Sequence, residues 1–92
     1  MHKLTIQVRT SDNLLELLKA QQSGCWTVAQ GKEKEISNVE IVSFDGSQRI
    51  EASFKENGSQ RLEDGRLIIA FTDACIRKCN VVFDSRNPVR YM

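Results

Sequence analysis

Three dipeptides that favour tight turns divide the second half of this chain into short β-type segments. Asp45-Gly46, Asn57-Gly58 and Asp64-Gly65 each pair two residue types that tolerate positive φ, which a tight hairpin turn demands. The segments around them are rich in β-branched and aromatic residues, and they read NVEIVSF, QRIEASF, RLIIAF and NVVF. Consecutive hairpins of this kind predict an antiparallel β-meander.

The N-terminal part predicts one more strand and the only helix. In KLTIQVR, apolar and polar residues alternate, which is the period of a strand with one buried face. The pattern then changes, because Leu14, Leu17 and Leu18 fall at the spacing of one helix face. Ser11, Asp12 or Asn13 can cap the start of a helix of about ten residues, with Asn13 and Glu16 at capping-box spacing, and Gly24 can end it in the left-handed conformation.

These elements together predict an α+β fold, in which an antiparallel sheet of four to six strands carries one α-helix packed on one face. WTVAQ is a candidate short strand, and the alternating charges of GKEKE suit a solvated loop. Val39 to Phe44 change face midway, which a bulge near Val42 would reconcile. We expect a single domain over residues 1–92, with 85–92 as an extended tail that is held if Val89 or Tyr91 docks.

Composition places the chain among ordinary globular proteins of one domain. It has 92 residues, of which 40% are hydrophobic and 27% are charged, and no apolar run approaches the roughly 20 residues that span a bilayer. The first ten residues alternate in polarity and do not resemble a signal peptide. These features predict a cytoplasmic protein with no membrane partner.

The stretch DACIRKCN holds two of the three cysteines and raises the question of a metal or redox site. A structural zinc ion needs four ligands, and Cys25, Cys75, Cys79 and His2 are the only Cys and His residues available. They lack a second compact pair, and there is no Cys-x-x-Cys motif, so we expect free thiols and no metal or cofactor. On a strand these thiols would instead join one core row, formed by Cys75, Cys79, Val81 and Phe83.

Nothing in the sequence predicts catalysis. His2 is the lone histidine and lies at the chain end. The paired carboxylates, Glu63-Asp64 and those around Glu33 and Glu35, fall in segments that solvated loops explain. No phosphate-binding glycine loop or nucleophile motif is present. We therefore expect a protein that is not an enzyme.

Binding remains, and the positive charges indicate where it would occur. Residues 1–64 hold eight Lys/Arg against ten Asp/Glu, whereas residues 65–92 hold five against two. The candidate partner-binding residues are Lys32, Lys34, Arg77, Lys78, Arg86 and Arg90. A solubilising surface is the alternative reading of the same residues. The net charge of +1 and the scarcity of aromatic residues predict weak binding to free DNA at most.

The chain as a whole, from MHKLTIQVRTSDNLLELLKAQQSGCW to NVVFDSRNPVRYM, resembles the small phage-encoded anti-CRISPR proteins, particularly the inhibitors of type I-F Cascade. The resemblance lies in size, α+β layout and lack of catalytic groups, and it assigns no role to any single residue. It implies a phage protein that acts in the host bacterial cytoplasm. There it would dock on Cas subunits, with CRISPR RNA as a further contact, and obstruct target-DNA binding.

Two other classes of function stay open. A small nucleic-acid-binding regulator would use the same cations on phosphates. A small phage structural or assembly protein would self-associate, for example by pairing an exposed edge strand.

Overall fold

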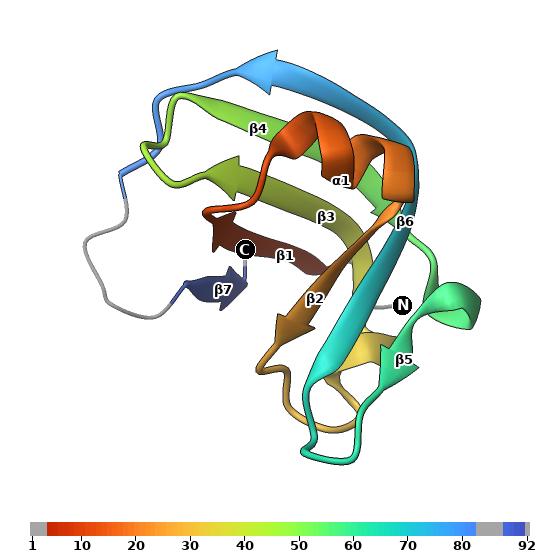
Figure 1. Ribbon diagram of the computed structural model, residues 1–92. Coiled ribbons are helices and arrows are strands. Elements are labelled where there is room, and N and C mark those ends of the chain that lie inside the picture. The colour runs from red at the N-terminus through yellow and green to blue at the C-terminus, as the bar shows by residue number, and fades with distance from the viewer. Residues whose placement is uncertain (1–3, 83–87, 92) are drawn as a thin grey trace.

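The computed structural model describes residues 4–82 and 88–91. Its elements, in chain order, are β1 (Leu4–Thr10), α1 (Leu14–Ala20), β2 (Gln22–Trp26), the 3-10 turn η1 (Lys32–Lys34), β3 (Ile36–Ser43), β4 (Gln48–Phe54), the 3-10 turn η2 (Glu56–Gly58), β5 (Gln60–Arg61), β6 (Leu67–Lys78) and β7 (Val89–Tyr91). Figure 1 shows them as a single curled sheet with α1 against it.

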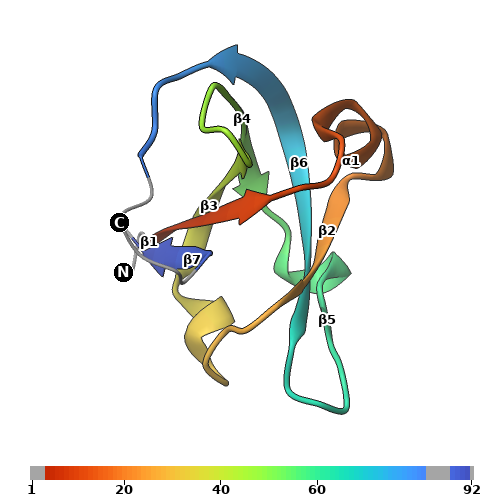
Figure 2. The same ribbon diagram turned by 60° about the vertical axis from the view of Figure 1, so that its left-hand side comes forward.

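The sheet has seven strands, in the order β2-β6-β4-β3-β1-β7, with β5 paired to β6. It curls strongly, as a half-barrel, so that β2 and β5 turn away from the direction of β1 and β3 (Figures 1 and 2). The α+β class with one α-helix is confirmed. The purely antiparallel meander of four to six strands is wrong, because β1 and β3 pair in parallel. Parallel neighbours need a long crossover, and the segment with α1 and β2 supplies it.

The core lies on the inner side of this curl. α1 contributes Leu14, which is buried, and Leu17 and Leu18, which pack on the core from its edge. The helix contacts β2, β4 and β6. The buried cluster consists of Ile6, Val8, Leu14, Val28, Ile36, Val39, Ile41, Ile50, Ala52, Leu67, Ile69, Phe71 and Val89.

α1 begins after Asn13, one of the three predicted caps, and its end differs from the prediction. The Asn13 side chain accepts hydrogen bonds from the amides of Leu15 and Glu16, at 2.8 and 3.3 Å. The helix ends after seven residues at Gln21, whose φ is 57° and whose amide donates to the Leu17 carbonyl. Gly24 is not the cap but a residue of β2. A Cβ there would lie 2.9 Å from the Ile68 side chain, so glycine allows β2 to approach β6 closely.

The predicted bulge near Val42 is wrong, and a bulge occurs elsewhere. β3 pairs with β4 without a break from Asn38 to Val42. The register shifts instead between β4 and β6, where Ala52 faces two residues of β6. Asp73 has a φ of 54° at this point. Asp is among the few residue types that tolerate this left-handed conformation.

The C-terminal part of the chain is arranged differently from the expectation. β6 runs on to Lys78 as a strand of 12 residues, and Asn80 to Val82 of the NVVF segment are not a strand; Phe83 lies outside the described residues. WTVAQ is not a strand either, since β2 ends at Trp26. β7 pairs with β1 and Val89 is buried, which is the condition under which the tail was expected to be held. Within the described residues, no helix has the length and apolar character to cross a membrane.

Candidate functional site

The outer face of the sheet carries polar side chains in rows that run across the strands. Successive residues of a strand point to opposite faces, so the neighbours of the core residues point outward. The strand register places Gln7, Glu40, Glu51 and Cys75 side by side, from β1 through β3 and β4 to β6. We call these four residues the glutamate row.

A row of arginines lies next to it, two residues along each strand. Here the register aligns Arg9 of β1, Val42 of β3, Arg49 of β4 and Arg77 of β6. Neighbouring strands are about 4.8 Å apart, so Arg49 and Arg77 start from adjacent positions and Arg9 from two strands away. Val42 fills the gap and is fully buried. We call Arg9, Arg49 and Arg77 the arginine row.

The two rows hold each other in place through ion pairs. Arg49 Nη2 lies 2.6 Å from Glu51 Oε2, and Arg49 Nη1 lies 3.6 Å from Glu40 Oε1. Arg77 Nε lies 2.9 Å from the other oxygen of Glu51. Burial disfavours the charge on Arg49, but its hydrogen bond to Glu51 and the negative charges beside it outweigh this, so the pKa of Arg49 is raised. Glu51 thus fixes two guanidinium groups at once.

The network continues to the edge of the sheet through Gln7. The Gln7 side-chain amide donates to Glu40 Oε1 at 2.9 Å, and Arg90 of β7 donates from Nε to Gln7 Oε1. Gln7 is only 2% exposed, so both of its contacts are shielded from water. One connected set of polar side chains therefore crosses five strands, from β7 to β6.

An exposed aromatic ring ends the arginine row on the β1 side. The Arg9 guanidinium lies 4.7 Å from the centre of the Phe44 ring, and Phe44 is 65% exposed. A cation over an aromatic ring is held by the ring quadrupole. At the opposite end, the Arg77 side chain is 64% exposed. The row therefore ends at an exposed ring on one side and at an exposed guanidinium group on the other.

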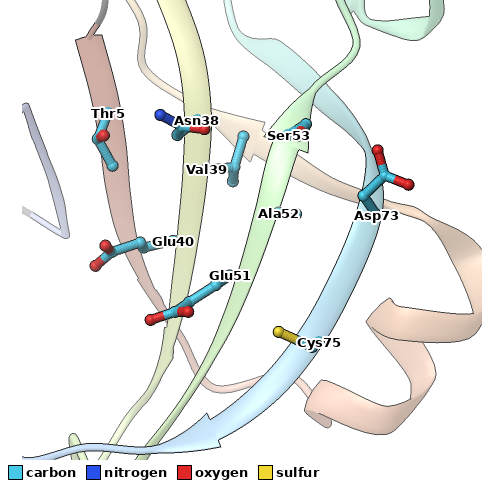
Figure 3. A pocket seen from close by; sticks show the side chains of 9 residues that line it. All are labelled: Thr5, Asn38, Val39, Glu40, Glu51, Ala52, Ser53, Asp73 and Cys75. Atoms are coloured by element: carbon cyan, nitrogen blue, oxygen red, sulfur yellow. The ribbon is translucent and has the colours of Figure 1, made fainter.

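A hollow of about 410 Å³ lies on the same face, beside the glutamate row. Figure 3 shows the carboxylates of Glu40 and Glu51 on one side of it, with Asp73 and Cys75 of β6 on the other. Its lining residues are Thr5, Asn38, Val39, Glu40, Glu51, Ala52, Ser53, Asp73 and Cys75. The hollow offers hydrogen-bond acceptors to a cationic group. No set of three or more Cys, His, Asp or Glu residues suited to hold a metal ion occurs in the described ranges.

The expected burial of the two thiols in one core row is wrong. Cys75 is exposed and Cys79 is half-buried, and both are free. The bulge at Asp73 makes Ala74 and Ile76 the residues that pack on the core, which turns Cys75 outward. Cys79 follows the end of β6, where its thiol donates to the Gly46 carbonyl at 3.3 Å.

Lys32 and Lys34 lie in η1, apart from the arginine row. Lys34 is exposed, and the Lys32 ammonium lies 5.3 Å from the centre of the Tyr91 ring and 3.7 Å from Glu35. Tyr91 is 37% exposed, and the loss of water around the rest of its side chain raises the pKa of its hydroxyl. The two lysines therefore belong to a separate surface, near the C-terminal strand.

Arg61 of β5 holds η1, which carries these lysines, in place. Its Nη1 donates to the carbonyl oxygens of Val28 and Gly65, and its Nη2 lies 2.6 Å from Glu33 Oε2. Partial burial opposes ionisation of Glu33, but hydrogen bonds from backbone amides and the charge of Arg61 outweigh it, so the pKa of Glu33 is lowered. The Arg61 cluster thus ties β5 to the loop after β2 and to η1.

The structure brings together only part of the predicted set. Arg77 and Arg90 belong to the same outer-face network, whereas Lys78 follows Arg77 in β6 and so starts toward the opposite face; Arg86 lies outside the described residues. Sequence reasoning missed Arg9 and Arg49. The alternation of the first strand already placed Arg9 on the face opposite the core, but the strand order needed to align it with Arg49 is not a local signal.

Comparison with known proteins adds no relative: no protein-family model, no curated protein and no solved structure matches the chain.

Proposed function

We propose that this chain is a non-catalytic, phage-encoded binding protein that docks on a bacterial CRISPR-Cas surveillance complex in the host cytoplasm and obstructs target-DNA binding. The resemblance to anti-CRISPR proteins supplies the partner class. The arginine row is the observation that carries the docking surface. Its members come from three strands, and carboxylates hold two of them in fixed positions.

Arginines that are already positioned lose less side-chain entropy on binding than free ones do. Their planar groups suit both the carboxylates of Cas subunits and the phosphates of the CRISPR RNA. Arg77 keeps its terminal nitrogens available, because the ion pair with Glu51 uses its Nε. The arginine row is thus suited to direct contacts with acidic groups.

The size of the molecule fits an obstructive function. A specific interface takes about 800 Å² from each partner. The chain exposes 5967 Å², so one face of the curled sheet can provide such an area without rearrangement. Because Glu40 and Glu51 offset part of the positive charge of the row, we expect weak binding to free DNA.

The test uses a purified type I-F surveillance complex and a labelled target duplex. Pre-incubation with the chain should abolish binding of the duplex, as measured by fluorescence anisotropy, and the chain should co-elute with the complex. Arg9→Glu and Arg77→Glu together should weaken inhibition at least tenfold. Lys19→Glu is the matched control, because Lys19 is an exposed cation of α1 and should be neutral.

Unchanged duplex binding at saturating chain, with no co-elution, would refute the proposed partner. Equal effects of the Lys19 and arginine substitutions would refute the assigned surface. The alternative, a nucleic-acid-binding regulator, predicts that the chain alone shifts DNA or RNA, with affinity that falls steeply with salt.

A further inference from the structure

Among the described residues, one half of β6 has an edge that no strand pairs with. Between Leu67 and Ala70, β6 pairs with β2 on one side, while β5 pairs with Leu67 and Ile68. The last hydrogen bond on the β2 side runs from the Phe71 amide to the Gln21 carbonyl, at 3.0 Å. From Thr72 to Lys78, β4 is the only strand that pairs with β6 within the described part of the chain.

The backbone groups on this edge can be assigned from the hydrogen bonds on the other side. The Cys79 amide donates to the Ser47 carbonyl at 2.9 Å, in line with the register that pairs Arg77 with Arg49 and Cys75 with Glu51. Residues of an antiparallel strand point their amides alternately to its two sides. The amides and carbonyls of Ala74, Ile76 and Lys78 therefore point away from β4, as a template for another strand.

We propose that this edge pairs with the same edge of a second copy of the chain, antiparallel, with the two-fold axis at Cys75. Cys75 then faces Cys75 of the other copy, and Arg77 faces Asp73 at both ends of the pairing. Asp73 is exposed and has no ion-pair partner in residues 4–82 and 88–91, while Arg77 is 64% exposed and bonds Glu51 through Nε alone. Opposite charges across an antiparallel pair are stabilising.

Other registers lack this complementarity. An axis at Ile76 would put Arg77 opposite Cys75 and leave both charges unpaired. An axis at Arg77 would oppose two arginines, which is destabilising. Charge therefore selects the register centred on Cys75. This pairing also brings the second copy toward Leu15, which is 61% exposed and lines a hollow together with Ile76 on the core side of the same edge.

The test is association of the purified chain, so it does not depend on the proposed function. Sedimentation velocity over a concentration series should show a reversible monomer–dimer equilibrium. Asp73→Lys and Arg77→Asp should each weaken dimerisation at least tenfold, because each opposes like charges. An equimolar mixture of the two variants should restore it, since the introduced lysine of one copy then faces the introduced aspartate of the other. Circular dichroism checks that each variant folds. Asparagine tolerates the left-handed conformation of this position, so Asp73→Asn removes the charge without straining the backbone and should weaken dimerisation less than Asp73→Lys does.

Cross-linking tests the position of the axis. Facing residues of a non-hydrogen-bonded pair have Cα atoms about 4.5 Å apart, within the range that a disulfide bridges. Diamide, which accepts two electrons and two protons from two thiols, should give a covalent dimer that Cys75→Ser abolishes and Cys79→Ser retains. A monomer at every concentration, failure of the mixed variants to associate, or a cross-link that survives Cys75→Ser would overturn the proposal.

Discussion

Gln7 of β1 and Glu40 of β3 are joined by a hydrogen bond of 2.9 Å between side chains, and Gln7 is only 2% exposed although it lies on the outer face. Outer-face positions of a two-layer protein are usually solvated, yet Gln7 is as buried as a core residue. Its amide group satisfies Glu40 on one side and Arg90 on the other. Gln7 is therefore the residue that connects the C-terminal strand to the charged centre of the sheet.

Replacing Gln7 should destabilise the fold through the partners that it leaves behind. Gln7→Ala removes one donor and one acceptor and leaves Glu40 and Arg90 without these bonds, which should cost about 1–3 kcal/mol in the free energy of unfolding. Urea denaturation measures it. Gln60→Ala, at an exposed site of β5, is the control and should change stability little. Equal effects of the two substitutions would show that the buried amide contributes nothing.

Structural features that depend on adjacent residues could be predicted from the sequence. Features that depend on the order of the strands could not. Asn13 and the leucines after it marked the helix correctly, because capping and helical spacing are properties of adjacent residues. The parallel pairing of β1 with β3 depends on which strands meet in space. A helix between two strands could have suggested it, since such crossovers commonly join parallel strands.

The face on which Cys75 lies was mispredicted for a similar reason. Simple alternation assigns it the parity of core residues, but the extra residue at Asp73 reverses the parity of the later residues of β6. The sequence carries a weak signal of this bulge, because Asp is one of the residues that tolerate positive φ.

Asp45 should titrate far below an ordinary aspartate. Hydrogen bonds from the Ser43 hydroxyl, the Ser47 amide and the Ser47 hydroxyl lower its pKa from 3.8 to about 2. Because the folded pKa is the lower one, the stabilisation is complete above the unfolded pKa of 3.8 and is lost as the pH falls through about 2. An NMR titration of the side-chain carboxyl measures this directly. Ser43→Ala should raise the midpoint, and a wild-type midpoint near 3.8 would contradict the assignment.

Gly46, in the turn after β3, should tolerate substitution less well than Gly31 does. Its φ is 78°, and an added Cβ would come within 2.1 Å of the Val81 carbonyl oxygen, so backbone would have to move. Gly46→Ala should lower stability by more than the roughly 1–3 kcal/mol of a strained φ alone. Gly31→Ala is the matched control, because φ is 89° there and no atom lies within 4 Å. Thermal unfolding of both variants should give the larger loss for Gly46, and equal losses would exclude a close contact with Val81.

Even a conservative replacement of Arg61 should destabilise the fold, because the geometry of its hydrogen bonds matters more than its charge. Its two terminal nitrogens donate hydrogen bonds to the Val28, Ala29 and Gly65 carbonyls and to the Glu33 carboxylate. These bonds join three segments of the chain. A lysine keeps the charge but offers one ammonium group in place of the planar fork. Arg61→Lys should therefore cost about 1–3 kcal/mol in urea denaturation. It should also raise the pKa of Glu33, which an NMR titration can follow.

Arg66→Lys is the control for Arg61→Lys. Arg66 is well exposed and lies 4.0 Å from Asp64, so its replacement should leave stability unchanged. If both lysine variants unfold at the wild-type urea concentration, charge alone accounts for the contribution of Arg61 to stability.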